Sequence, residues 1–135
     1  MTAIQLQREE LASWLQDASL KPHVDYMIVD VRDADFANGN IATAVNIPAH
    51  ELNANPFEHQ PLLSVPKRLI FHCLLSQVRG PKSANTYLRS VGAAEGQQVF
   101  VLVGGFSNWQ EKYGKDKNLT KNYNAKFWAN GGYEY

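Results

Sequence analysis

The chain has 135 residues, no formal net charge and one cysteine. A domain typically holds roughly 100–200 residues, so this length predicts one compact domain. The balanced charge provides no basic surface for nucleic acid or for an anionic membrane. A single cysteine excludes an internal disulfide and every metal site that needs several cysteines. We therefore expect no metal, no cofactor, and neither a nucleic acid nor a membrane as partner.

The N-terminal segment does not resemble a targeting signal. It carries Arg8, Glu9 and Glu10 where a signal peptide would need an apolar core. The longest apolar runs, at residues 69–75 and 99–103, are far shorter than the ~20 residues that span a bilayer. We expect a cytoplasmic protein, and a chain this small can also enter the nucleus.

The first half of the chain predicts one helix and two strands. Apolar residues at near-helical spacing from Leu6 onward predict an N-terminal helix that Lys21-Pro22 ends. The nearly continuous apolar run over 26–31 predicts a strand buried on both faces, and 45–48 predicts a shorter one. Three prolines within 51–66 limit that stretch to short helical pieces.

The second half alternates strands with helices. Residues 68–72 predict a strand, which is followed by a helix that starts near Pro81 and stops at Gly92. Residues 98–103 predict the next strand, and Gly104-Gly105 turns from it into a helix that ends at Gly114. This alternation predicts an α/β fold with a mainly parallel sheet, in which functional residues gather at the carboxyl ends of the strands.

The last segment, 115–135, is polar with scattered aromatic residues. We interpret it as a C-terminal extension packed on the same domain by its aromatic side chains. A flap or an oligomer contact near the active site is the alternative. The sequence leaves the oligomeric state open.

The segment IFHCLLSQVRGPKSA, residues 70–84, carries the chemistry. Cys73 follows a predicted strand and faces a helix N-terminus, whose dipole favours a thiolate. Arg79 follows five residues later and offers a two-pronged donor for an oxyanion. Between them the backbone N–H groups can curl inward as an anion nest. The predicted oxyanion-binding residues are Leu74, Leu75, Ser76, Gln77, Val78 and Arg79.

Cys73 has a simpler interpretation as a small buried hydrophobe at a strand end. Three neighbours favour the catalytic one: His72 precedes it, Gly80-Pro81 starts a helix behind Arg79, and Ser76 can donate a hydrogen bond to the thiolate or to a loop oxygen. We therefore predict that Cys73 and Arg79 are catalytic.

These residues resemble the H-C-x5-R signature of the rhodanese-fold phosphatases of the M-phase-inducer type, and more closely their small single-domain relatives, which include eukaryotic arsenate reductases. The segments 29–49 and 99–114 resemble the entry motif and the closing strand-turn-helix of the same fold. The resemblance implies a rhodanese-like α/β domain over 1–114, with a central sheet of about five strands flanked by helices.

The resemblance implies that Cys73 attacks phosphorus and forms a thiophosphate intermediate. The substrate would be a phosphorylated protein or a small oxyanion. Sulfurtransferases of this fold usually have a shorter loop, so the five residues here favour phosphatase chemistry. The alternatives are an arsenate reductase with glutathione or glutaredoxin as external co-substrate, a sulfurtransferase, and a non-catalytic binding module.

The supporting residues are less sharply defined. Asp30 and Arg32 match an Asp-x-Arg pair that braces this fold, while Asp33 and Asp35 lie past the strand's carboxyl end, where either could act as general acid. We expect His72 to organise the loop. Asn40 stands where relatives often have histidine, and we expect it to lose a structural hydrogen bond.

Overall fold

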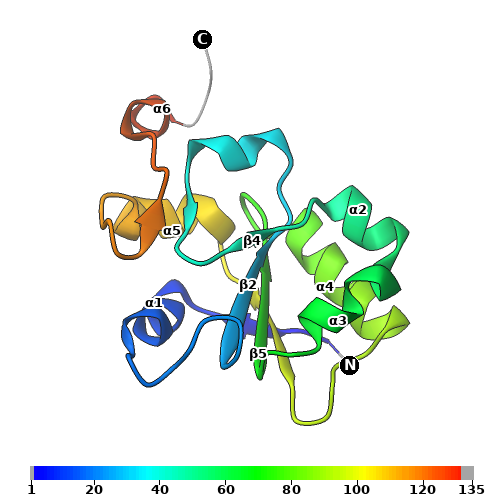
Figure 1. Ribbon diagram of the computed structural model, residues 1–135. Helices are drawn as coiled ribbons and strands as arrows, with labels where there is room; N and C mark the ends of the chain where they lie inside the picture. The colour runs from blue at the N-terminus through cyan, green and yellow to red at the C-terminus, as the bar shows by residue number, and fades with distance from the viewer. Residues whose placement is uncertain (1, 132–135) are drawn as a thin grey trace.

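The computed structural model describes residues 2–131, which form a five-stranded parallel sheet flanked by helices (Figure 1). The strand order is β1-β6-β5-β2-β4, and every pairing is parallel. The predicted α/β fold with a central sheet of about five strands is therefore confirmed. The strands are β1 Ile4–Leu6, β2 Tyr26–Asp30, β4 Val45–Asn46, β5 Arg68–His72 and β6 Gln98–Leu102.

Helices cover both faces of this sheet, as Figure 1 shows. One face carries α1 (Arg8–Gln16) and α5 (Gly105–Tyr113), and the other carries α2 (Ala49–Ala54), α3 (Gln60–Leu63) and α4 (Arg79–Ser90). Two 3-10 helices, η1 (Ala34–Asn38) and η2 (Pro56–His59), complete the connections. The proline-rich stretch indeed contains only short helical pieces.

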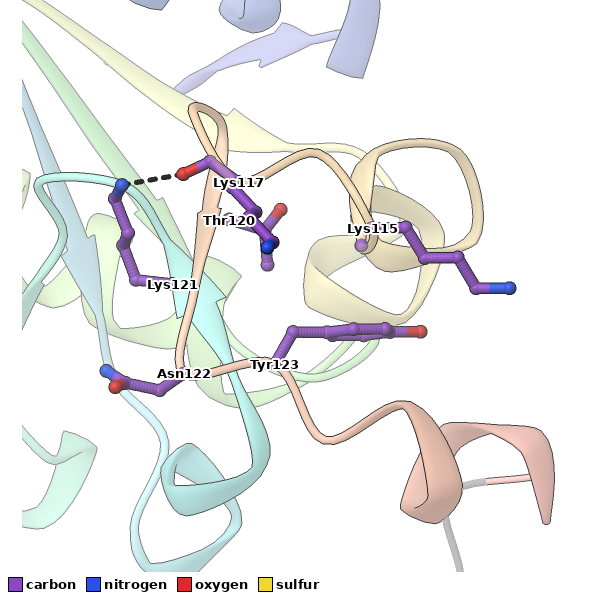
Figure 2. A pocket seen from close by; sticks show the side chains of 7 residues that line it. Lys115, Lys117, Thr120, Lys121, Asn122 and Tyr123 are labelled. Atoms are coloured by element: carbon purple, nitrogen blue, oxygen red, sulfur yellow. Dashed lines mark hydrogen bonds between the residues drawn. The ribbon is translucent and has the colours of Figure 1, made fainter.

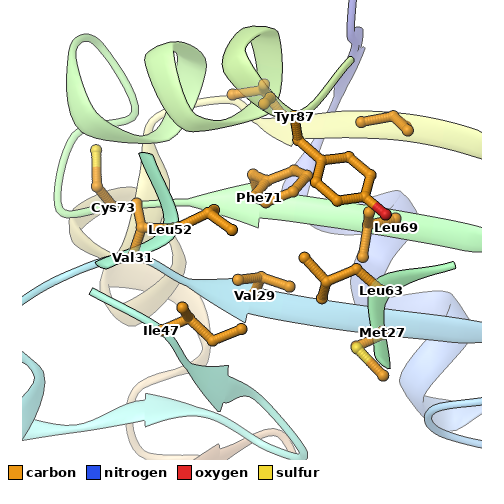
Figure 3. Packing of buried hydrophobic residues seen from close by; sticks show 13 residues of the cluster. Met27, Val29, Val31, Ile47, Leu52, Leu63, Leu69, Phe71, Cys73 and Tyr87 are labelled. Carbon is orange, nitrogen blue, oxygen red and sulfur yellow. The ribbon is translucent and has the colours of Figure 1, made fainter. Parts of the chain in front are cut away.

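Each central strand contributes alternate side chains to two cores. On β5, Leu69 and Phe71 face α4, whereas Ile70 faces α1 and α5, and all three are fully buried. Figure 3 shows the core on the α4 side, which runs to Cys73 at the end of β5. Burying a large apolar side chain contributes about 1.5–3 kcal/mol, so these two cores fix β5 firmly.

The N-terminal region differs from the prediction. Leu6 lies in β1 and pairs with Leu102, and the helix that follows ends at Gln16. The expected helix from Leu6 to Lys21 was therefore wrong at both ends. A strand of three residues is too short to show alternation, and Leu6 is 1% exposed because it packs into the core beside β6.

The C-terminal extension packs against the domain. Its strand β7 (Thr120–Lys121) pairs antiparallel with β3 (Asn40–Ile41), and helix α6 (Ala125–Ala129) follows. Leu119 is buried, and Thr120 accepts a hydrogen bond from the indole of Trp109 at 3.0 Å. Residues 132–135 of the predicted extension lie outside the described residues. Within residues 2–131, no helix has the length and apolar character needed to cross a membrane.

Candidate active site

Cys73 lies directly after β5, at the carboxyl edge of the sheet. Its side chain is 3% exposed, and the loop 74–78 curves past the sulfur into α4, which begins at Arg79 (Figure 3). A hollow of about 170 Å³ opens here, and its lining comes from the segment predicted to bind an oxyanion. The lining residues are Cys73, Leu74, Leu75, Gln77, Val78 and Arg79.

Ser76 contacts the sulfur through its backbone. Its N–H donates to Sγ of Cys73 at 3.2 Å, while its hydroxyl oxygen accepts from the N–H of Cys73 at 3.4 Å. The left-handed backbone of Ser76, with φ of 53°, turns this N–H inward. From the sequence we expected the Ser76 hydroxyl to donate to the sulfur. In the structure the backbone N–H of Ser76 donates instead, as backbone amides do in an anion nest.

The close approach of α4 to β5 depends on Gly80. A Cβ at this position would lie 3.2 Å from the backbone N of Cys73 and 3.2 Å from Cα of His72. The absence of a side chain therefore lets the first turn of α4 approach the strand end. The positive end of the α4 dipole then faces the hollow, where it stabilises negative charge.

Helix α5 holds the other side of the loop. The N–H groups of Phe106 and Ser107 donate to the carbonyl oxygens of Cys73 and Leu74, both at 2.9 Å. Gly105 has φ of 57°, and a Cβ there would lie 2.5 Å from the carbonyl oxygen of Cys73. The Gly-Gly turn thus shapes the pocket through backbone contact.

Arg79 is paired with Asp35 from η1. Its Nη1 and Nη2 donate to Oδ1 and Oδ2 of Asp35 at 3.1 and 2.8 Å, and both side chains are about one-third exposed. End-on pairing uses one N–H of each Nη and leaves the edge formed by Nε and one Nη free to bind an oxyanion. Asp35 can therefore orient Arg79 without replacing the substrate.

The pair is held in its charged form. Burial by itself would raise the pKa of Asp35. The hydrogen bonds and charge of Arg79, together with the charge of Arg32, have the larger effect, so the pKa of Asp35 is lowered below 3.8. The hydrogen bonds to Asp35 in turn raise the pKa of Arg79. An ionised carboxylate at neutral pH fits an orienting residue better than the proton donor that the sequence allowed.

Asp33, the other predicted acid, contacts the side chain of His50, whereas Arg79 pairs with Asp35. The carboxylate of Asp33 is 55% exposed and lies 3.4 Å from Nδ1 of the exposed His50. Its backbone N–H donates to Oδ1 of Asp35 at 3.1 Å. In this structure Asp33 therefore supports Asp35 through its backbone.

His72 is fully buried behind the loop. Its Nδ1 lies 3.0 Å from the carbonyl oxygen of Cys73, so Nδ1 carries the proton and donates it. Burial lowers the pKa of His72, against the opposing charge of Asp30, whose Oδ2 lies 3.6 Å from Nε2. A neutral imidazole that donates to a loop carbonyl can hold the loop in place, so the role of loop organiser stays a prediction that this contact supports.

The Asp30–Arg32 pair braces the neighbouring segment. Both side chains are fully buried, and Arg32 donates to Asp30 through Nε and Nη2. Its remaining N–H groups reach the carbonyl oxygens of Asp35 at 3.1 Å and Gly39 at 2.7 Å. The guanidinium also lies 4.4 Å from the ring centre of Phe106. This brace ties η1, and hence Asp35, to the core.

A second hollow, of about 460 Å³, lies on the C-terminal extension. Its lysines do not converge: Lys121 donates to the carbonyl oxygen of Lys117 at 2.6 Å, while Lys115 extends in the opposite direction (Figure 2). This geometry forms no anion cradle like the one beside Cys73. Among residues 2–131, no group of three His, Cys, Asp or Glu side chains is arranged to hold a metal ion.

Comparison with known proteins identifies the family of this chain. The model of the rhodanese-like domain matches residues 8–112. The CDC25-like phosphatase YCH1 of Saccharomyces cerevisiae is 34% identical over 132 residues, covering 88% of this chain and 89% of that protein. Arsenate reductase 2.2 of Oryza sativa subsp. japonica is 34% identical over 88 residues, which cover 62% of this chain and 68% of that protein.

A solved structure shares the arrangement described above. The yeast protein tyrosine phosphatase of the rhodanese family, Ygr203w, superposes with a TM-score of 0.81 at 33% identity, and covers 95% of this chain and 99% of that chain. The resemblance stated from the three sequence motifs is therefore confirmed. This chain belongs to the rhodanese-like domain family, and within it is similar to single-domain phosphatases and arsenate reductases.

Proposed function

We propose that this protein is a cysteine-dependent phosphatase that hydrolyses phosphoric monoesters on Cys73. The observation that carries the proposal is the hollow beneath which Sγ lies, with the Ser76 N–H at 3.2 Å and Arg79 on its rim. A nucleophile, inward amides and a guanidinium are what transfer of a phosphoryl group to sulfur requires. The names of the relatives support the same activity.

The proposed reaction has two displacements. The Cys73 thiolate donates an electron pair to phosphorus, an S–P bond forms, and the ester P–O bond breaks as the leaving oxygen takes both electrons and then a proton. Water next attacks phosphorus, which releases inorganic phosphate and restores the thiolate. Arg79 and the amides of residues 74–78 stabilise the charge on the equatorial oxygens in both steps.

The rim of the hollow favours an aromatic ester. Leu75 and Val78 are 49% and 71% exposed, and both belong to the loop that lines the hollow, so they form an apolar patch on its rim. An aryl ring attached to a phosphate held above Cys73 would contact these side chains. We therefore infer a phosphotyrosine-containing protein or another aryl phosphate as the substrate class.

Arsenate reduction is the second candidate. Arsenate has the shape and charge of phosphate, and two of the similar proteins carry arsenic-related names. Cys73 is the sole cysteine of the chain, so no second thiol of the protein can release an arsenylated intermediate. An external thiol such as glutathione or glutaredoxin would have to donate the electrons.

One comparative assay separates these activities. The purified protein is given an aryl phosphate, then arsenate with glutathione and glutaredoxin, then thiosulfate with cyanide. The proposal predicts phosphate release that is lost in Cys73→Ser, with little thiocyanate formed. Arsenate-dependent thiol oxidation that exceeds phosphate release would favour the second candidate, and turnover that persists in Cys73→Ser would contradict both.

A further inference from the structure

The C-terminal extension contacts the segment that carries Asp35. At the end of η1, the carbonyl oxygen of Asn38 accepts hydrogen bonds from the indole Nε1 of Trp128 at 2.9 Å and from the backbone N–H of Asn124 at 3.2 Å. The side chain of Asn124 also donates to Oδ1 of Asn38 at 3.2 Å. Three hydrogen bonds thus join the extension to one residue of η1.

Few buried contacts hold η1 in place. None of its residues, Ala34–Asn38, is buried. A segment with little buried apolar surface depends on its hydrogen bonds for its position. Arg32 holds it from the core through the carbonyl oxygens of Asp35 and Gly39, and the extension holds its C-terminal end, next to Gly39, through Asn38.

Packing makes the contact with the extension specific. The ring of Trp128 lies 5.5 Å, centre to centre, from Phe106, whose backbone N–H holds the carbonyl of Cys73. A Cβ at Gly39 would lie 3.3 Å from Cα of Tyr123, so the extension lies directly against the end of η1. The side chain of Asn122 donates to Oδ1 of Asn40 at 3.1 Å, which adds a further hydrogen bond between the extension and the segment that follows η1.

We propose that Trp128 is a positioning residue for the oxyanion site, acting through Asn38 and Asp35 on the orientation of Arg79. The inference rests on the proposed role of Arg79 in oxyanion binding. Trp128 does not line the hollow beside Cys73, so its effect on a bound oxyanion is indirect. The path is short: Asn38 and Asp35 belong to the same helical turn, and Asp35 pairs directly with Arg79.

The test measures oxyanion binding without requiring turnover. Because Cys73 is the sole cysteine, iodoacetamide alkylates one thiol, and inorganic phosphate in the hollow slows that reaction. The concentration of phosphate that halves the alkylation rate reports binding. Trp128→Phe keeps an aromatic ring beside Phe106 but removes the indole donor. We expect this variant to need about fivefold more phosphate, the effect of losing one hydrogen bond.

Two further variants separate positioning from general destabilisation. Trp14→Phe makes the same substitution on α1, where the ring packs on Phe100, and should leave the half-protecting concentration unchanged. In an Asp35→Asn background the path is already broken, so Trp128→Phe should add less than a twofold effect. Kinetics on an aryl phosphate, measured in parallel, should show the same pattern in kcat/KM.

The outcomes are distinct. If phosphate protects Cys73 of the wild type from alkylation but the wild type releases no phosphate from an aryl ester, the proposed phosphatase activity is contradicted. The effect of Trp128→Phe on protection then still decides the positioning inference. Unchanged protection in Trp128→Phe would overturn the inference. So would a full fivefold effect of Trp128→Phe in the Asp35→Asn background, since the indole would then act by another route. Absence of phosphate protection in the wild type would overturn it as well.

Discussion

Arg79 donates hydrogen bonds from both terminal nitrogens, Nη1 and Nη2, to the carboxylate oxygens of Asp35, at 3.1 and 2.8 Å, across 44 positions of sequence. This end-on pair fixes the guanidinium plane and leaves a second two-pronged edge for an oxyanion. Asp35 is itself held by the backbone N–H of Asp33 and, through its carbonyl, by buried Arg32. The orientation of the arginine therefore depends on a network that reaches the core.

Replacing Asp35 should weaken catalysis more than folding. In Asp35→Asn, the guanidinium loses its charged partner and samples other orientations, so we expect kcat/KM on an aryl phosphate to fall about tenfold, equivalent to about 1.4 kcal/mol. Asp17→Asn, a matched change on the exposed end of α1, should leave kcat/KM unchanged. A rise of kcat/KM in Asp35→Asn would show that Asp35 blocks the site instead of orienting it.

The pH profile distinguishes an orienting carboxylate from a proton donor. Because pairing with Arg79 lowers the pKa of Asp35 below 3.8, the carboxylate is ionised throughout pH 5–8. The ion pair therefore stabilises the folded protein above pH 3.8, and this stabilisation disappears only as the pH falls through the lowered pKa of Asp35. We expect Asp35→Asn to lower kcat/KM by the same factor at every pH from 5 to 8. If the wild type loses kcat/KM at alkaline pH and Asp35→Asn does not, Asp35 would instead be the general acid.

Gly105 should be needed for the shape of the loop. In Gly105→Ala, the new methyl group meets the carbonyl oxygens of Cys73 and Leu74, at 2.5 and 2.6 Å, so the loop must shift. We expect kcat/KM to fall at least about tenfold, because small displacements of reacting groups are costly. Gly96→Ala introduces a similar positive-φ strain where no atom lies within 4 Å, so it should lower the Tm without changing kcat/KM. Equal kinetics in the two variants would contradict this role.

Buried His72 should make the fold sensitive to mild acid. Burial lowers its pKa from 6.5, so the unfolded chain binds a proton at a higher pH than the native protein does. The free energy of unfolding should therefore fall as the pH drops below about 6.5. Asp30 and Arg32 are the charged groups that face the ring. His72→Asn keeps a donor for the Cys73 carbonyl but does not titrate, so its Tm should fall less between pH 7 and 5.5 than that of the wild type. An identical decline would rule out His72 as the cause.

The sequence predicted the elements whose signals are local. The strand before Cys73, the helix after it and the Gly-Gly turn into α5 each have a continuous apolar run or a turn residue at the expected position. The strand β1 escaped prediction because three residues carry no periodicity. Its position depends on pairing with β6, which is distant in the sequence.

The contacts within the candidate site were less predictable. Arg79 and Asp35 were both singled out, but no local pattern indicates that they pair, since the topology of the sheet brings η1 beside α4. The inward turn of the Ser76 N–H depends on a left-handed backbone that is uncommon for serine. The bond from Trp128 to Asn38 spans 90 positions and follows from tertiary packing alone.

Detection of phosphoryl-Cys73 would show directly whether the thiolate attacks phosphorus. The wild type is mixed with an aryl phosphate, quenched within milliseconds, digested, and analysed by mass spectrometry. We expect a transient phosphoryl group on the peptide that contains Cys73, absent from Cys73→Ser and formed more slowly in Arg79→Ala. Steady turnover by the wild type with this peptide unmodified at every time, or with phosphate on another residue, would contradict nucleophilic attack by Cys73.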